Sequence, residues 1–296
     1  MPWPPTSPPP RDPGRRGPRH PGHGVSEPHG AWRPEEEPAL PARSVVASTL
    51  LGVRPPRLPT AILVRSCGLF GIRPGTARVA ISRMAAAGEL VADDDGYALG
   101  PDLRARQARQ DLSRQGTTTA WDADRDGWHQ LVVTGEARAA ADRTALRRAA
   151  RTLRLAELRE GVWLRPANLH LADQPDALAV AEAQCLRLRA HPAGDGAALA
   201  GRLWDLDGWA RRARRLVAAL EASRPALEGH DLDALPHGFV LSAASLRHLQ
   251  SDPLLPAALL PSAWPGPDLR RTWEDWNQAF LAVWADWYRA EQADTA

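Results

Sequence analysis

Six arginines between Arg54 and Arg83 are the side chains whose type and spacing most clearly indicate a chemistry. No acidic residue lies among them, although the whole chain is nearly balanced, with 37 basic and 35 acidic residues. Guanidinium groups donate to phosphate oxygens, so a local run of one charge is typical of a surface that contacts nucleic acid. A solvated helix face is the alternative interpretation. The run consists of Arg54, Arg57, Arg65, Arg73, Arg78 and Arg83.

The segment Arg73–Gly88 predicts the helix that presents part of this run. Pro74 suits the first turn of a helix, where an N–H group has no helical partner in any case. Arg78, Ser82 and Arg83 fall on one side of the helix. The opposite side repeats apolar residues at helical spacing, namely Ala77, Ala80, Ile81 and Met84. We therefore expect one face to pack on a core and the polar face to meet a partner.

The flanking segments indicate a winged helix-turn-helix, whose second helix enters the major groove of DNA. Ser44–Leu51 predicts a first helix that opens with a capping serine, and Thr60–Phe70 predicts a second. Leu90-Val91 and Tyr97–Leu99 flank the turn signal Asp95-Gly96, which is typical of a hairpin. The predicted partner is double-stranded DNA. The predicted contact residues are Arg73, Thr76, Arg78, Ser82, Arg83, Arg54 and Arg57.

A second unit begins near Trp121 and alternates strand and helix patterns. Leu103–Ser113 before it is helical but polar, as expected of a connector. The expected order of strand, helix, strand, helix and strand favours a split β-α-β, ferredoxin-like domain. The segments are Trp128–Val133, Ala137–Arg154, Leu158–Leu164, Pro175–Ala181 and Ala183–Leu188.

The last third, Ala197–Ala296, is predicted to be mostly helical. Within it, Asp252–Gly266 combines prolines with leucines, and we interpret it as a stiff apolar strap or as the wall of an effector pocket. Aromatic residues then recur at helical steps. They suit a core, a ligand platform or a dimer surface. They are Trp273, Trp276, Phe280, Trp284 and Trp287.

Several classes of protein are disfavoured by what the sequence lacks. No apolar run approaches the ~20 residues of a membrane span, and the N-terminus does not resemble a signal peptide. Cys67 and Cys185 are far apart, which suits a reducing cytoplasm and gives no zinc-finger spacing. The histidines of the N-terminal segment are too loosely spaced for a dedicated metal site. We expect no cofactor and no metal.

An enzyme is the rival class. A metal-dependent nuclease of this fold would need a carboxylate at the end of the first strand. That strand ends at Val133-Thr134-Gly135, with no acid before Glu136. No phosphate-binding glycine loop and no hydrolase motif is present. The chain is therefore predicted not to be an enzyme. A regulator of another family, with an unrelated sensor, is the third alternative.

The order of segments from Ser44 onward resembles the PaaX-type repressors of phenylacetate catabolism. The most specific stretch is His248–Gly266 (HLQSDPLLPAALLPSAWPG). The resemblance implies an α+β chain with an N-terminal winged helix, a central ferredoxin-like (Cas2-like) domain and a helical C-terminal domain. It also implies a homodimer that an aryl-acyl-CoA releases from DNA. The other stretches that carry it are Phe70–Leu90, Trp121–Val133 and Leu158–Asn168.

The chain departs from that family pattern at two positions. Arg73 stands where a capping serine or threonine is usual, and it cannot accept a hydrogen bond from the helix N-terminus. The wing carries Asp93, Asp94 and Asp95, which a phosphate backbone repels. The operator sequence therefore does not carry over from the family, and the effector need not be phenylacetyl-CoA.

The sequence thus predicts a cytoplasmic, dimeric, ligand-responsive repressor of transcription that binds a palindromic operator and no membrane. A phosphate-bearing effector such as phenylacetyl-CoA needs arginine beside an apolar slot. The candidate effector residues are Arg147, Arg148, Arg211, Arg212 and Trp264. The predicted parts are a disordered extension (1–41), the winged helix (42–101), a connector helix (102–120), the ferredoxin-like domain (121–196) and the helical domain (197–296).

Overall fold

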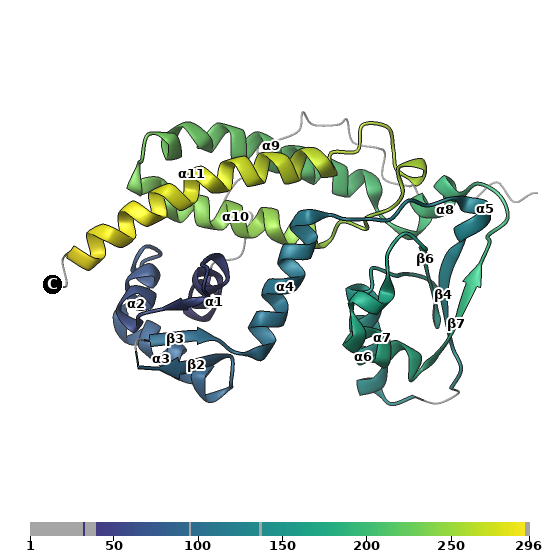
Figure 1. The fold of residues 1–296 in the computed structure, drawn as a ribbon, viewed down its shortest axis with the longest axis horizontal. Helices are drawn as coiled ribbons and strands as arrows, with labels where there is room; N and C mark the ends of the chain where they lie inside the picture. Colours follow the sequence, from purple (N-terminus) through teal and green to yellow (C-terminus); the bar gives the residue numbers. More distant parts are fainter. Residues whose placement is uncertain (1–31, 33–39, 95, 136–137, 294–296) are drawn as a thin grey trace, which may run out of the picture. The chain divides into compact units, whose positions relative to one another are not determined.

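The N-terminal part of the structure combines three helices with a small antiparallel sheet (Figure 1). The computed structural model describes residues 32, 40–94, 96–135 and 138–293 of the chain. The strands of this sheet are hydrogen-bonded in the order β1-β3-β2. Its elements are α1 (Ala42–Gly52), β1 (Arg57–Leu58), α2 (Thr60–Gly68), α3 (Pro74–Ala86), β2 (Leu90–Asp93) and β3 (Gly96–Leu99).

The predicted helices and hairpin of this part are confirmed, with two differences. The first helix begins at Ala42 with Pro41 before it, so Ser44 lies inside the first turn and does not cap the helix. Strand β1 was not expected, because two residues are too short to show a periodic pattern. It pairs with β3 across Gly96, where a Cβ atom would lie 2.2 Å from the carbonyl oxygen of Leu58. Only glycine permits this approach of the two strands.

Helix α4 (Pro101–Gln115) continues directly from β3 and packs against α10. The sequence predicted a connector helix because the segment is polar and was not expected to bury a face. That expectation was wrong. The helix does bury a face, but the buried side chains are largely polar. Gln107 donates from Nε2 to the carbonyl oxygen of Leu51 at 2.9 Å, which satisfies one of them. The buried residues of α4 are Leu103, Gln107, Gln110 and Ser113.

The second sheet is antiparallel throughout, and its strands are hydrogen-bonded in the order β5-β6-β4-β7. The single strand predicted over Leu158–Leu164 is wrong. Glu160 and Gly161 form a turn there, with φ of +80° at Gly161, and the segment is split into a hairpin. The elements are α5 (Ala123–Asp126), β4 (Trp128–Val133), α6 (Ala140–Thr152), β5 (Ala156–Arg159), β6 (Val162–Pro166), α7 (Pro175–Glu182) and β7 (Cys185–Ala190).

The two faces of this sheet pack against different elements. Leu131 and Trp163 pack with Leu146 and Leu153 of α6 in one hydrophobic cluster. The opposite face carries Trp128 and Leu164, which pack with the strap and α8 instead. The alternation of side chains along a strand assigns each residue to one of the two faces. Leu146 of α6 and Leu153, the residue after the end of this helix, lie seven positions apart and are both buried.

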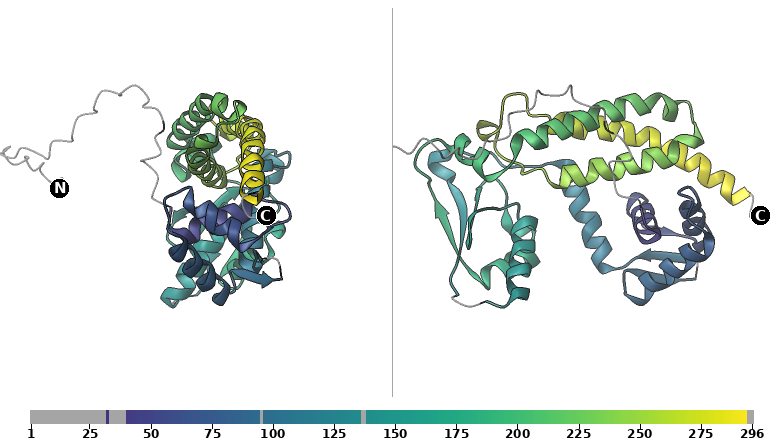
Figure 2. Two further views of the ribbon diagram at one scale, coloured as in Figure 1. Left: turned by 90° about the vertical axis from the view of Figure 1, so that its left-hand side faces the viewer. Right: turned by 180° about the vertical axis from the view of Figure 1, so that it is seen from behind.

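The C-terminal part is helical, and Figure 2 shows its three long helices side by side. The aromatic residues at helical steps along α11 are all buried, which favours the core among their three interpretations. This core is continuous with the apolar faces of α1, α2 and α3. The helices are α8 (Gly196–Leu203), α9 (Leu206–Glu228), α10 (Leu235–Gln250) and α11 (Gly266–Ala293).

The predicted N-terminal extension, 1–41, lies almost wholly outside the described residues. Trp32 is an exception: it is buried and meets His237 of α10 edge to face, with 5.6 Å between ring centroids. The segment predicted to be disordered therefore contains one tryptophan that is buried. No helix among the described residues is long and apolar enough to cross a membrane.

Candidate nucleic-acid interface and effector sites

Helix α3 exposes the side chains that the sequence assigned to DNA. Arg73, Thr76, Arg78, Ser82 and Arg83 are all exposed. On the opposite face of the helix, the residues buried against α1 and α2 are Ala77, Ile81 and Met84. The structure therefore brings five of the seven predicted contact residues to one helix.

Val79 was not among the predicted contact residues, yet it is 52% exposed next to Arg78. An exposed branched side chain on a polar helix face has no packing role in the chain itself. In recognition of the major groove, such an apolar side chain contacts the methyl group of thymine. The signal was present in the sequence, because Val79 is the one large apolar residue out of phase with the buried face.

The turn before α3 is set by the backbone. Gly71 adopts a φ of +69°, which redirects the chain between α2 and α3. At the N-terminus of α3, Arg73 makes no side-chain capping bond, as the sequence predicted. The free N–H groups of this first turn are thus left exposed beside an arginine. Such a helix end attracts an anion.

The arginines of the run differ in whether they meet an acid. Arg54 pairs with Asp111 of α4 at 2.9 Å, and Arg65 pairs with Glu291 of α11 at 3.0 Å. Arg57 pairs with Asp93 of β2, also at 2.9 Å. Among the described residues, Arg73, Arg78 and Arg83 form no ion pair with any acid. The unpaired positive charge of the run is therefore concentrated on α3 and its first turn.

A cavity of about 490 Å³ lies between the end of α4, the end of α6 and the segment after β6. Exposed arginines from two helices line it, and one acid, Asp173, does so as well. Of the predicted effector residues, only Arg148 is among its lining residues. The other arginines on its wall are Arg109, Arg151 and Arg154.

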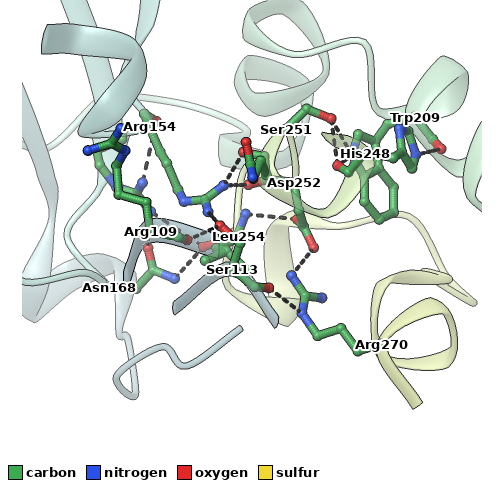
Figure 3. A network of polar contacts seen from close by, with 12 residues as sticks. Arg109, Ser113, Arg154, Asn168, Trp209, His248, Ser251, Asp252, Leu254 and Arg270 are labelled. Atoms are coloured by element: carbon green, nitrogen blue, oxygen red, sulfur yellow. Dashed lines mark hydrogen bonds and ion pairs between the residues drawn. The ribbon is translucent and has the colours of Figure 1, made fainter. Parts of the chain in front are cut away.

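Arg154 fixes one side of this cavity by joining three segments (Figure 3). Its guanidinium donates to Ser113 Oγ of α4 and to the carbonyl oxygens of Gln250 and Asp252. The Asp252 carboxylate in turn pairs with Arg270 of α11 at 2.8 Å. These bonds hold the start of the strap against α4, so the cavity wall is rigid on this side.

Arg165 is buried behind the same wall, with no exposed surface. It donates to Asn168 Oδ1 at 2.9 Å and to the carbonyl oxygen of Pro166 at 3.0 Å. Burial lowers the pKa of Arg165 to about 9, because the charged form is removed from water. The strap segment is anchored here too, since Asn168 Nδ2 donates to the Leu254 carbonyl oxygen at 2.8 Å.

The remaining predicted effector residues lie apart from that cavity. Arg147 is exposed on α6, and Arg211 is exposed on α9. Arg212 is half-buried on α9. Trp264 of the strap stacks on Trp209, with 4.5 Å between ring centroids. The five residues therefore do not form one site.

A histidine is packed against the other face of the same tryptophan. His248 stacks on Trp209 at 4.4 Å, and its Nε2 lies 2.9 Å from the Trp209 carbonyl oxygen. Because a carbonyl oxygen only accepts, Nε2 carries the proton. Burial lowers the pKa of His248 to about 4, so the ring is neutral at pH 7.

Possible metal ligands and the two cysteines are further candidate groups in the part of the chain that the structure describes. No group of three or more His, Cys, Asp or Glu side chains that could hold a metal ion occurs there. Cys67 and Cys185 are both buried and unbonded. Burial raises the pKa of the Cys67 thiol to about 11, which disfavours the reactive thiolate.

Comparison with known proteins places the chain in a family. Residues 41–103, which hold α1 to β3 and the start of α4, match a family described as PaaX-like protein. The solved structure of uncharacterized protein Rv0674 from Mycobacterium tuberculosis is similar over 86% of this chain and 99% of that one. It shares 41% sequence identity, with a TM-score of 0.64. No protein with a curated description matches the chain. By the family match over residues 41–103, the chain belongs to the PaaX-like family.

Proposed function

We propose that this chain is a DNA-binding regulator of transcription, and that it acts as a dimeric repressor released from its operator by a small effector. The observation that carries the proposal is the exposed face of α3. This face holds Arg78, Ser82 and Arg83, and neither arginine meets an acid among the described residues. Membership of the PaaX-like family supports the assignment to a regulator.

In this proposal α1 to β3 are a winged helix-turn-helix within residues 42–101. Helix α2 supports α3, which enters the major groove, and the hairpin β2–β3 is the wing. The order β1-β3-β2 and the short turn between α2 and α3 support this layout. Arg73 and Thr76 at the start of α3 then lie where base edges are read, since recognition helices use their N-terminal residues.

The four-stranded sheet is proposed as a ferredoxin-like domain within residues 121–196. The order β-α-β-β-α-β along the chain, with both helices on one face, supports this assignment. Helix α4 within 102–120 is proposed as the connector, and residues 197–296 as the helical domain. A second copy of the chain would place two α3 helices about 34 Å apart on a palindromic operator.

Release by an effector requires that it binds better to a conformer that no longer fits DNA. A phosphate-bearing effector, such as an aryl-acyl-CoA, finds arginines in the 490 Å³ cavity, where Arg109 and Arg148 face it from two different helices. Since α4 leads directly from the wing, a ligand that draws α4 toward α6 would shift the DNA-contact unit. The two buried cysteines suit a protein that acts in the reducing cytoplasm.

The test compares arginines that belong to the same run but differ in pairing. A duplex is first selected from random sequences with the wild-type protein, and binding of Arg78→Ala, Arg83→Ala and Arg65→Ala to it is then measured by fluorescence anisotropy. Each α3 variant is expected to lose about 1–3 kcal/mol of binding free energy. Arg65→Ala, whose arginine pairs with Glu291, is the control and should bind like wild type.

Thermal unfolding of all three variants shows whether they fold equally well. Equal affinities of wild type, Arg78→Ala and Arg83→Ala would exclude α3 as the DNA-reading helix. Failure of the wild type to select any duplex would exclude the DNA-binding function itself.

A further inference from the structure

A second cavity lies between α1, α4, α10 and α11, and the proposed function leaves it unassigned. Its volume is about 340 Å³, which is at the small end of the range for ligand pockets. It opens where the N-terminal helices meet the C-terminal helices. It shares α4 with the arginine-lined cavity described above, but the two have no lining residue in common.

One wall of this cavity is aromatic. Trp273, Phe280 and Trp284 of α11 line it together with Phe239 of α10. Their positions are partly fixed by contact with one another, since Phe280 and Trp284 lie 6.3 Å apart between ring centroids. Leu281, which is 37% exposed, also lines the cavity. A flat apolar ligand would find offset or edge contacts with these rings.

Polar atoms without partners gather at the same cavity. Thr49 Oγ1, Trp273 Nε1 and Arg114 Nε are buried and make no hydrogen bond within the described part of the protein. All three side chains line the cavity. An unpaired buried polar group costs about 1–3 kcal/mol. Trp273 Nε1 and Arg114 Nε can only donate hydrogen bonds, so these two atoms of the lining residues match an acceptor and not a donor.

The charge of the lining is positive. Asp111 and Glu274 are its acids, and both are engaged by arginines: Arg54 pairs with Asp111 at 2.9 Å, and Arg114 pairs with Glu274 at 3.0 Å. Arg106 is a further, half-buried arginine of the lining, and no acid pairs with it among the described residues. Its pKa is lowered by burial and by the nearby charges of other arginines. An anion at this position would compensate that charge.

We propose that this cavity binds a compact aromatic acid, with its ring against the aromatic wall of α10 and α11 and its carboxylate facing Arg106 of α4. The aromatic wall calls for the ring of such a ligand, and the excess positive charge calls for its carboxylate. The volume of about 340 Å³ admits a one- or two-ring acid.

The site also suggests a route of regulation, which rests on the proposed function. α1 belongs to the DNA-contact part of the chain and α4 is the connector that follows it, whereas α10 and α11 belong to the C-terminal helices. A ligand wedged between them alters how α1 and α4 pack against the C-terminal helices. The orientation of α3 follows, because α1 and α3 share one core.

The test is isothermal titration calorimetry on the full chain without DNA. Phenylacetate and 2-naphthylacetate are titrated beside the matched neutral amides, phenylacetamide and 2-naphthylacetamide. Wild type is expected to bind the acids at least about tenfold more tightly than the amides, because a charged hydrogen bond to Arg106 is lost in the amide. Ala243→Leu fills the cavity from α10 and should abolish binding of both the acids and the amides.

Two arginine variants on α4 identify the cavity. Arg106→Gln should remove the preference for acid over amide, whereas Arg109→Gln, whose side chain lines the other cavity, should leave it unchanged. Thermal unfolding confirms that each variant is folded. No binding of either acid by wild type up to about 1 mM, equal affinity for acid and amide, or an unchanged preference in Arg106→Gln would overturn the proposal.

The same titrations in the presence of the selected duplex separate this inference from the proposed function. If wild type binds the acids but no duplex, the cavity assignment stands and the DNA-binding function fails. If wild type binds the duplex but neither acid, only the cavity assignment fails.

Discussion

The guanidinium of Arg57 on β1 lies 2.9 Å from the carboxylate of Asp93 on β2. The two strands do not pair directly, since β3 lies between them. The ion pair therefore spans the small sheet, and it neutralises one arginine of the basic run with an acid from the wing. The acidic wing consequently has an intramolecular role in addition to its repulsion of phosphate.

This pair makes the effect of the wing acids testable. Replacing Asp93 by Asn removes a negative charge and the ion pair that partly neutralises Arg57. We expect duplex affinity to rise by about two- to tenfold at low salt, and the rise to shrink as the salt concentration increases, because the wing repels phosphate less. Fluorescence anisotropy at several salt concentrations measures both quantities.

The matched control is Asp94→Asn, which removes an exposed charge for which no ion pair exists among the described residues. It should raise affinity less and leave the salt slope nearly unchanged. Asp95, the third acid of the wing, lies outside the described residues, and the triple Asn variant is predicted to bind any duplex more tightly than wild type. A loss of affinity in Asp93→Asn would mean that the carboxylate itself contacts DNA, as in acceptance of a hydrogen bond from cytosine.

The two effector regions predicted from sequence are separated by a second pair of variants. The complex with the selected duplex is titrated with phenylacetyl-CoA, phenylacetate and free coenzyme A. We expect the thioester to release wild-type protein and to release Arg148→Ala/Arg151→Ala at a concentration at least about tenfold higher, because phosphate contacts are lost. Arg211→Ala/Arg212→Ala, on α9, is the comparison and should respond like wild type.

If the thioester releases Arg211→Ala/Arg212→Ala only at a higher concentration, and releases Arg148→Ala/Arg151→Ala like wild type, the site for the phosphate groups lies on α9 instead. If no acyl-CoA releases the wild-type complex, the effector class of the family does not extend to this chain.

The buried histidine predicts how stability depends on pH. In the folded protein burial lowers the pKa of His248 to about 4, whereas an unfolded histidine titrates near 6.5. The unfolded chain thus binds more protons between these two values. The free energy of unfolding is unaffected above pH 6.5 and falls as the pH is lowered toward 4, by on the order of 3 kcal/mol in total.

Thermal unfolding between pH 7 and pH 4.5 measures this effect. His248→Gln keeps a donor for the Trp209 carbonyl oxygen and should flatten the decline of Tm with falling pH. His170→Gln, at an exposed position, should leave it unchanged. Burial also lowers the pKa of His129 to about 4, so part of the decline should remain in His248→Gln. The same slope in His248→Gln and wild type would contradict the assignment.

Substitution of two glycines in the hairpin region tests where its backbone requires a residue without a Cβ atom. Gly96→Ala places a Cβ atom 2.2 Å from the Leu58 carbonyl oxygen, at a φ of +150°, and should separate β1 from β3. Gly88→Ala introduces a left-handed alanine at a φ of +72°, but no atom lies within 4 Å of its Cβ. We expect a cost of about 1 kcal/mol for Gly88→Ala and clearly more for Gly96→Ala, measured by urea unfolding. Equal costs would show that the close approach of the strands is not maintained in solution.

The local spacing of apolar and polar residues was sufficient to predict the helices and the hairpin that form the candidate DNA interface. The spacing of Ala77, Ile81 and Met84 indicated which face of α3 is buried, and Arg78 and Arg83 followed on the other. Helical and strand periodicity are local properties, so the hairpin and most of the longer elements were predicted as well. Elements shorter than one period, such as β1, and turns inside an apolar run, such as Glu160-Gly161, gave too little signal.

The sequence could not show which arginines pair with acids. Arg54, Arg57 and Arg65 stand in a run without acids, yet each meets an acid that lies 36 or more positions away in the chain. Ion pairs depend on distance in space, so the acid-free run overstated the free charge on α1 to β3. The cavity residues were equally hidden, because Thr49, Arg106 and Trp273 come from three helices that only tertiary packing brings together.

The sequence by itself determined most of the longer helices and strands, the exposed basic face of α3 and the family of the chain, because these depend on short-range spacing and on one distinctive motif. Only the tertiary structure decided which arginines remain available for phosphate and which segments form each cavity. The physical reason is that electrostatic and packing interactions act between residues that are close in space, whatever their separation along the chain.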